Sequence, residues 1–147
     1  MAIRRMDNVL IVVEDLEAAK AFFTALGMTL EGQTTVEGAW ADRVIGLDDV
    51  RADIALMRTP DGHGGVELSK FHSPRAVRLG PKDAPSNTLG IRRIMFAVDD
   101  LDATLARIRP LGASLVGEVA QYEDVYRLCL VRGPEGIIVG LAEQFGG

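Results

Sequence analysis

An internal repeat constrains the fold of this 147-residue chain more than any other feature. Residues 8–32 align without a gap with residues 93–117, and apolar run, acidic break, amphipathic segment and closing glycine recur in the same order. Residues 56–62 align with residues 130–136 at a shorter offset, because the first copy carries an insertion that includes Trp40. Two copies of one unit therefore account for most of the chain.

Each copy begins with a short β-branched run, at 9–13 in the first copy, that predicts a buried strand. Asp15 is a suitable N-cap for a following amphipathic helix that Gly27 ends, and Asp100 takes the same role in the second copy. Three further strands are predicted in each copy, at 28–36, 51–58 and 65–71 in the first and at 113–121, 124–132 and 137–143 in the second. The pattern predicts an α+β fold class with two βαβββ modules.

Turns at 60–62 and 134–136 predict hairpins between the last two strands of each copy. The Pro-rich residues 72–88 predict a linker between a first module at 1–71 and a second module at 89–147. A chain of 147 residues fits one structural domain made of the two repeats.

Composition excludes several classes of protein. A formal charge of −5 and the lack of any basic run longer than two residues argue against nucleic acid as a partner. The single cysteine, Cys129, lies in an apolar run and is expected to be a buried hydrophobe, without an intramolecular disulfide. No apolar stretch approaches the roughly 20 residues of a membrane span, and nothing resembles a secretory signal. We therefore expect a cytoplasmic protein with no membrane partner.

The ordered and duplicated motifs resemble the vicinal oxygen chelate superfamily of glyoxalases, extradiol dioxygenases and bleomycin-resistance proteins. The segments that carry this resemblance are residues 8–16, 59–62, 66–68, 94–101 and 133–136. The resemblance implies a cup-shaped arrangement of eight strands in two curved sheets, and a homodimer whose interface helps to build the sites.

The resemblance also implies a divalent metal ion that acts as a Lewis acid on two neighbouring substrate oxygens. Its four ligand positions fall on Asn8, Glu67, Arg93 and Gly140, and the internal repeat pairs the same positions, Asn8 with Arg93 and Glu67 with Gly140. Only Glu67 keeps a ligand side chain, since arginine is a cation and glycine has no side chain. We expect no metal ion and no cofactor, and we expect Arg93 to pair with Glu67.

Several roles remain open for these residues. Glu67 is a residual metal ligand, a ligand-binding or acid–base carboxylate paired with Arg93, or half of an inert buried ion pair. Arg93 lines the cavity or is a surface arginine. Asn8 binds ligand or is a buried amide whose hydrogen bonds are satisfied.

Further candidates lie outside the ligand positions. Trp40, in the insertion, either covers the cavity as part of a lid or only packs against neighbouring residues. Tyr122 and Arg127 either grip a polar or aromatic ligand or form cross-strand pairs in a hairpin. His63 is expected at an exposed hairpin tip, about 13 Å from Glu67 in a regular strand, so that the two cannot share a metal ion. His72 is expected at the start of the linker, and a place at the mouth of the cavity is the alternative.

The sequence therefore favours a metal-independent protein that binds a small organic molecule, as bleomycin-resistance proteins sequester their drug. The first alternative is a metal-dependent lyase, isomerase or dioxygenase that completes its ligand set with a residue such as His72 or Glu123. The second is a metal-free acid–base enzyme in which Arg93 stabilises an oxyanion beside Glu67. Nucleotide-binding and hydrolase signatures are absent from the sequence.

Overall fold

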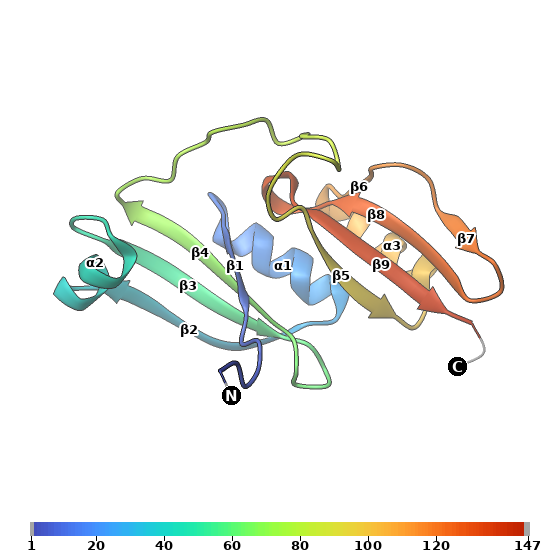
Figure 1. Ribbon diagram of the computed structural model, residues 1–147, viewed down its shortest axis with the longest axis horizontal. Coiled ribbons are helices and arrows are strands. Elements are labelled where there is room, and N and C mark those ends of the chain that lie inside the picture. Colours follow the sequence, from blue (N-terminus) through green and yellow to red (C-terminus); the bar gives the residue numbers. More distant parts are fainter. Residues whose placement is uncertain (1, 146–147) are drawn as a thin grey trace. The chain divides into compact units, whose positions relative to one another are not determined.

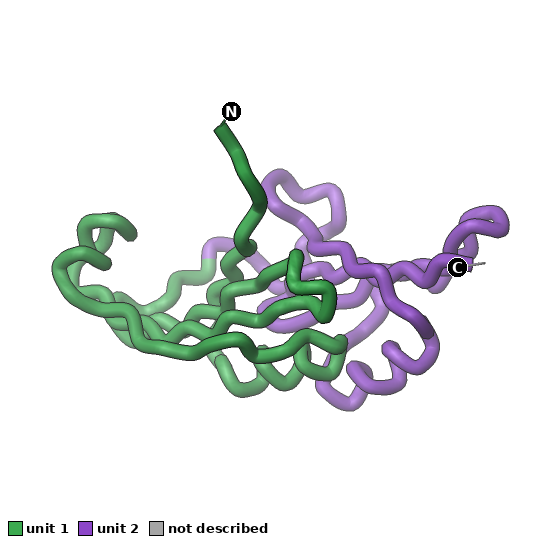
Figure 2. The backbone as a smooth tube through the Cα atoms, turned by 90° about the horizontal axis from the view of Figure 1, so that it is seen from below, with its two compact units in different colours: residues 1–78 green, residues 79–147 purple. Residues whose placement is uncertain are grey.

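The computed structural model describes residues 2–145 and divides the chain into two compact units, unit 1 up to Arg78 and unit 2 from Leu79 onward (Figure 2). The division falls inside the Pro-rich segment 72–88. Each unit has its own sheet.

Unit 1 has the strand–helix–three-strand order that the repeat predicts (Figure 1). Its elements are β1 (Val9–Val12), α1 (Leu16–Leu26), β2 (Thr29–Glu37), α2 (Ala39–Ile45), β3 (Arg51–Arg58) and β4 (Gly65–Ser73). The strand order is β1-β4-β3-β2, with β1 parallel to β4 and the other neighbours antiparallel. The last strand runs two residues beyond the predicted end at residue 71, so His72 belongs to the sheet and not to the linker.

Unit 2 repeats this topology. Its elements are β5 (Arg93–Val98), α3 (Leu101–Ile108), the short 3-10 helix η1 (Arg109–Leu111), β6 (Ser114–Leu115), β7 (Ala120–Tyr122), β8 (Tyr126–Arg132), the 3-10 turn η2 (Pro134–Gly136) and β9 (Ile138–Gln144). The strand order is β5-β9-β8-β6, and β7 also pairs with β8. The predicted single strand at 113–121 is wrong, because the chain leaves the ladder around Gly117 and forms two short strands; residues 2–145 thus contain nine strands rather than eight.

The two sheets share a register as well as a strand order. Leu10 of β1 pairs with Glu67 of β4, and Met95 of β5 pairs with Gly140 of β9. These are the positions that the sequence repeat aligns. The repeat is therefore a structural duplication, and the α+β fold with two βαβββ modules is confirmed.

Local chemistry explains where the two main helices begin. The Asp15 carboxylate accepts a hydrogen bond from the Ala18 N–H, and the Asp100 carboxylate accepts one from the Ala103 N–H, both at 3.0 Å. Gly27 ends α1 in the left-handed conformation, with φ of 111°. Both predicted N-caps are confirmed.

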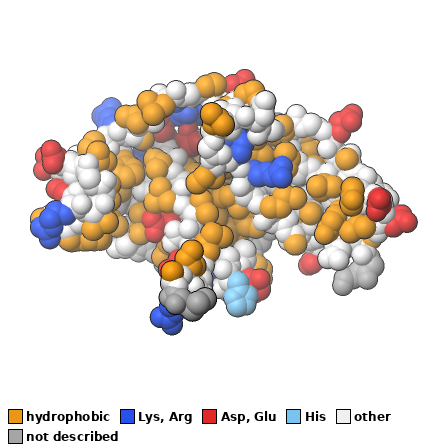
Figure 3. All heavy atoms as spheres, in the orientation of Figure 1, with side chains coloured by type: hydrophobic (Ala, Val, Ile, Leu, Met, Phe, Trp, Pro, Cys, Tyr) orange, Lys and Arg blue, Asp and Glu red, His pale blue; other side chains and the backbone are white. Residues whose placement is uncertain are grey.

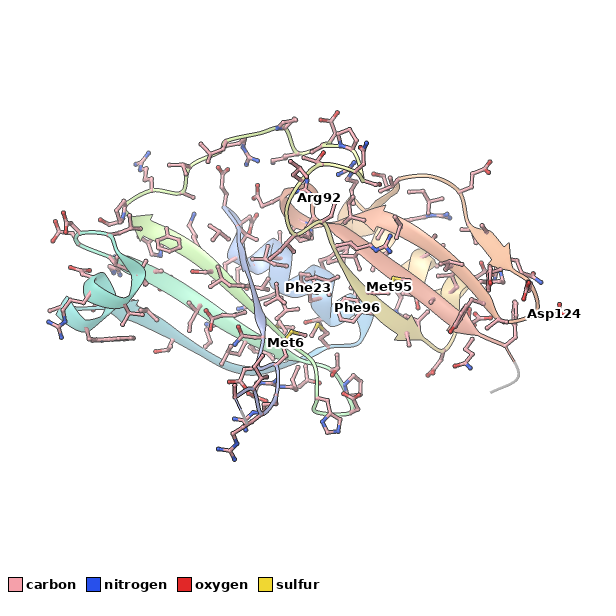
Figure 4. All side chains as sticks on the ribbon, viewed as in Figure 1. Met6, Phe23, Arg92, Met95, Phe96 and Asp124 are labelled. Atoms are coloured by element: carbon pink, nitrogen blue, oxygen red, sulfur yellow. The ribbon has the colours of Figure 1, made fainter. Side chains whose placement is uncertain are left out.

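One face of the unit 1 sheet forms the core of that unit. The helix α1 contacts β2, β3 and β4, and its Phe23 is completely buried (Figure 4). The sheet residues that are buried on this side are Ile11, Ala55, Met57, Val66 and Leu68. Because side chains alternate along a strand, Leu10, Leu56 and Glu67 lie on the opposite face, which α1 does not cover.

The insertion that distinguishes the first copy forms the helix α2 and an ordered turn. The Asp42 carboxylate accepts hydrogen bonds from the backbone N–H groups of Asp49 and Val50, at 3.1 and 2.8 Å.

Cys129 is 3% exposed, as expected, and burial raises the pKa of its thiol. Among residues 2–145, every helix is too short or too polar to span a lipid bilayer.

Candidate functional site

Glu67 is held on the inner strand β4 between two leucines. Its partner on β1 is Leu10, which is 47% exposed, and its partner on β3 is the half-buried Leu56. Along β4 its neighbours on the same face are Gly65 and Ser69. Glu67 is itself half-buried, and its cross-strand partners on both sides are leucines.

This carboxylate has no protein partner in its own unit. Among the described residues of unit 1, no hydrogen bond or ion pair reaches Glu67. A half-buried carboxylate between apolar side chains loses part of its hydration without a compensating contact. Such a group is suited to bind a ligand that brings a hydrogen-bond donor or a positive charge.

A pocket of about 720 Å³ lies in unit 1, and Glu67 is not among its lining residues. Leu56, the cross-strand neighbour of Glu67, lines it together with Asn8, which precedes β1. The other lining residues are Arg5, Met6, Asp7, Glu31, Arg58, Gly62 and His63. Asn8 is exposed in this pocket and is not the buried amide that the sequence allowed as an alternative. The pocket volume falls within the range of small-molecule sites.

An arginine and a glutamate form one wall of this pocket. The Arg58 guanidinium donates two hydrogen bonds to the Glu31 carboxylate, at 3.0 and 3.1 Å, and a third to the Asp7 carbonyl oxygen, at 3.3 Å. The Arg58 hydrogen bonds lower the pKa of Glu31, and Glu31 raises the pKa of Arg58. Neither Arg58 nor Glu31 was predicted as a site residue, although the repeat aligns Arg58 with Arg132.

Gly65 makes room for that arrangement. A Cβ atom at this position would stand 2.6 Å from the Asp7 carbonyl oxygen and 2.8 Å from Nη1 of Arg58. The missing side chain therefore lets the segment before β1 and the Arg58 guanidinium approach the end of β4.

In unit 2, the position equivalent to Glu67 is Gly140, and the Met95 side chain fills the space beside it. Gly140 is buried, and a Cβ atom placed on it would collide with Sδ of Met95 and lie 3.3 Å from Leu130. Met95, labelled in Figure 4 on β5, is the counterpart of Leu10, and Leu130 is the counterpart of Leu56. The thioether covers the glycine, so this position offers no oxygen ligand.

Arg132, the equivalent of Arg58 in unit 2, is held by backbone carbonyl oxygens of its own unit. Arg132 donates hydrogen bonds to the carbonyl oxygens of Gly136, Asp83 and Ala84, at 3.2, 3.3 and 2.7 Å. Asp83 and Ala84 belong to the part of the Pro-rich segment that lies within unit 2. In unit 1, the equivalent Arg58 lines an open pocket.

Arg93, the other residue proposed for catalysis, is exposed at the start of β5. It shares a face of the sheet with Met95 and Ala97, as the sequence predicts. Within the described part of unit 2 it has no hydrogen-bond or ion-pair partner. Its proposed pairing with Glu67 stays a prediction.

The peripheral candidates lie at separate places. Trp40 is on α2 and is 57% exposed, and Tyr122 ends β7, opposite Tyr126, and is 59% exposed. Arg127 donates to both carboxylate oxygens of Asp102 at the start of α3, at 3.3 and 3.2 Å. Arg127 therefore lies on the helix-covered face of its sheet, whereas its neighbour Tyr126 lies on the other face.

The histidines have different surroundings. His63 is exposed in the turn between β3 and β4, as predicted, and contributes to the pocket. Nε2 of His72 lies 2.8 Å from Oδ2 of Asp53, whose other oxygen accepts a hydrogen bond from Thr35. Asp53 is the cross-strand partner of Lys70 in the β3–β4 register, on the helix-covered side of the sheet. Side chains alternate along a strand, so His72 lies on this side and Glu67 lies on the opposite face of unit 1.

The donor set does not fit the metal ion that the resemblance implies. Across residues 2–145, no three His, Cys, Asp or Glu side chains lie close enough together to hold a metal ion. Glu67 is the one carboxylate at the four equivalent positions, and Gly140 is covered by sulfur. His72 is on the wrong face to join Glu67, and Glu123 lies in the β7–β8 turn of unit 2. Divalent metal sites of this kind need three or four protein ligands, which these positions do not supply.

The outer surface carries no extended basic patch on the face that Figure 3 shows. Apolar side chains are spread over this face, and the Lys and Arg side chains form small separate groups.

Comparisons with known proteins agree with this fold. The chain is 52% identical to a glyoxalase family protein from Bacillus cereus, with a TM-score of 0.93 and coverage of 99% of both chains. It is 24% identical over 145 residues to the uncharacterized protein YaeR of Escherichia coli, covering 98% of this chain and 99% of that protein. A glyoxylase/bleomycin resistance protein/dioxygenase domain from a Frankia species shares the fold at 17% identity, with a TM-score of 0.66 over 99% of this chain and 96% of that one.

A protein-family model matches residues 5–141, which include both repeats and all four ligand-equivalent positions. The matched span, the duplicated topology and the shared register lead to one assignment. The chain belongs to the Glyoxalase/Bleomycin resistance protein/Dioxygenase superfamily.

Proposed function

We propose that this protein binds a small organic molecule, without a metal ion, on the face of unit 1 that carries Glu67. The observation that carries the proposal is the half-buried Glu67 carboxylate, which lies between Leu10 and Leu56 and has no partner in its unit. An apolar surface with a single oriented charge is typical of small-molecule sites.

The adjoining pocket supports the same proposal. It has room for a drug-sized molecule, and one of its lining residues, Leu56, is the cross-strand partner of Glu67. Asn8 adds an amide that both donates and accepts hydrogen bonds. We therefore expect a ligand that contacts Glu67 to extend toward Asn8.

Metal content is the decisive measurement for the metal-independent part of the proposal. Elemental mass spectrometry of untagged protein, before and after incubation with Zn²⁺, Ni²⁺, Mn²⁺ or anaerobic Fe²⁺, is expected to show no stoichiometric metal ion that depends on Glu67. Glu67→Gln removes the carboxylate with little change of shape, and Glu118→Gln removes the same charge from an exposed position in unit 2.

Nearly one equivalent of metal ion that is retained by Glu118→Gln and lost by Glu67→Gln would overturn the proposal. A metal-dependent lyase, isomerase or dioxygenase would then be the better assignment. Equal, low metal content in all three proteins supports binding without a metal ion.

We also propose a homodimer, as the family resemblance implies. Large apolar side chains are exposed in unit 1, among them Val44 at 77% and Val77 at 81%. Light scattering coupled to size-exclusion chromatography tests this directly: a mass near 32 kDa, twice 15.8 kDa, is expected, and a mass near 15.8 kDa at all concentrations would contradict it.

A further inference from the structure

We infer that the ligand is an organic cation, whose positive group binds Glu67 and whose apolar body lies on Leu10 and Leu56. This inference rests on the proposed binding function and names its ligand class. In this inference the organic cation, and not Arg93, is the positive partner of Glu67. It would occupy the place at which the family resemblance implies a metal cation.

The first step of the argument is the charge balance around the pocket. Arg58 is held by the Glu31 carboxylate and the Asp7 carbonyl oxygen. Arg5 donates to the Asp7 carboxylate at 2.7 Å. The cations and carboxylates that line the pocket therefore neutralise one another, and Glu67 is the carboxylate of this face whose charge unit 1 leaves uncompensated.

The second step is the cost of covering Glu67. A ligand that buries this carboxylate removes water from it, and a neutral apolar ligand returns nothing in exchange. An anionic ligand would add repulsion. A cation with N–H donors restores both charge and hydrogen bonding, and hydrogen bonds between charged groups are shorter and stronger than neutral ones.

The third step concerns the body of the ligand. Leu10 and Leu56 flank Glu67 on both neighbouring strands, so that aliphatic surface lies on each side of the charge across the sheet. Leu10 is 47% exposed and therefore has apolar surface that a ligand can cover. A compact, strongly hydrated inorganic cation would leave this surface unused, whereas an alkyl or aryl ammonium ion would cover it.

The experiment uses the full chain and a set of small aromatic and aliphatic scaffolds, each prepared as the ammonium ion, the alcohol and the carboxylate. Chemical-shift changes of backbone amides report binding, and the resonances of residues 10, 56 and 67 mark the site. We expect the ammonium member of a scaffold to bind about tenfold more tightly than its alcohol, and its carboxylate to bind least.

Glu67→Gln separates charge recognition from shape. In this variant we expect the preference for the ammonium ion to disappear, so that it binds no better than the alcohol. Glu118→Gln is the charge-matched control and should keep the tenfold preference. Added salt should weaken ammonium binding to the native protein but not alcohol binding.

The outcomes distinguish the two proposals. If alcohols or carboxylates bind at residues 10, 56 and 67 as tightly as the ammonium ions, the cation inference is overturned and small-molecule binding stands. If no scaffold in any form shifts these resonances, both are overturned. A tenfold ammonium preference that survives in Glu67→Gln also overturns the inference, because the charge would then be recognised elsewhere.

Discussion

On its inner strand unit 1 carries Glu67 between Leu10 and Leu56, whereas unit 2 carries Gly140 between Met95 and Leu130. The strand order and register are the same, yet the first position presents a carboxylate and the second is covered by a thioether. The same contrast recurs at the repeated arginines, since Arg58 lines an open pocket while Arg132 is engaged by its own unit's backbone carbonyls.

Duplication has preserved the framework of the two units but not the site. Backbone pairing and helix caps depend on positions that both copies keep, such as Asp15 and Asp100. The open face depends on a few side chains that differ between the copies. The binding function is accordingly proposed for unit 1.

The matched core positions of the two units provide the largest expected effect. Leu68 and Leu141 are both completely buried at equivalent places in β4 and β9. Replacing either one by alanine leaves a cavity and should lower the free energy of unfolding by about 2 to 5 kcal/mol, measured by urea denaturation. Leu79→Ala, at a residue 96% exposed, should change it by less than about 0.5 kcal/mol. A large loss for only one of the two core variants would break the equivalence of the units.

Restoring a carboxylate in unit 2 sharpens the comparison next. Gly140→Glu places a side chain where Met95 and Leu130 pack, and should cost about 2 to 3 kcal/mol of unfolding free energy. Met95→Ala combined with Gly140→Glu should recover part of this loss, because the sulfur that blocks the position is removed. A double variant less stable than Gly140→Glu alone would show that Met95 is not the obstacle.

The pocket wall of unit 1 predicts a smaller effect. Gly65→Ala forces the Asp7 carbonyl oxygen and the Arg58 guanidinium to move, and should lower the unfolding free energy by about 1 to 2 kcal/mol. Gly32→Ala is the matched control, since a Cβ atom there meets nothing within 4 Å. Equal losses in thermal or urea denaturation of the two variants would contradict the close approach at Gly65.

The smallest expected effect concerns pH. Hydrogen bonds from His72 and Thr35 hold the pKa of Asp53 below its ordinary value. A carboxyl group whose pKa is lower in the folded chain stabilises the fold above its unfolded pKa, and this contribution disappears as the pH falls through the folded value. We expect less than about 1 kcal/mol to be lost as the pH falls from about 5 through that lowered pKa.

Asp53→Asn should lack this part of the pH profile, whereas Asp48→Asn should keep it. Urea denaturation at several pH values measures the difference. Parallel profiles for the native protein and Asp53→Asn would contradict the role given to the Asp53 contacts. The equivalent residue of unit 2 is Arg127, which pairs with Asp102 of α3.

Most of the framework could be predicted from local patterns. The N-cap aspartates, the apolar runs and the Pro-containing turns act through neighbours in sequence, and the structure confirms the helices and hairpins that they predict. The prediction of one strand at 113–121 was wrong, because β-propensity alone does not show that the chain leaves the ladder near Gly117. The helix α2 was not predicted, since the insertion has no counterpart in the second copy.

The candidate site was predictable only in part. The repeat and the family resemblance together identified the four equivalent positions, including Glu67 and Gly140. They did not identify the Glu31–Arg58 pair, which joins two strands across a β-bulge, or the methionine over Gly140. Arg127 and Tyr126 are adjacent in sequence but point to opposite faces of their sheet.

The sequence by itself determined the duplicated α+β framework and the loss of three of the four metal-ligand side chains, because periodicity and residue identity are local properties. Only the tertiary structure decided which groups are free and which are engaged. Whether a carboxylate or guanidinium has a partner depends on residues from distant strands, as with Arg58 and Glu31, and on packing over a glycine, as with Met95 and Gly140. These long-range contacts leave Glu67 without a partner in its unit, and on this the proposed function depends.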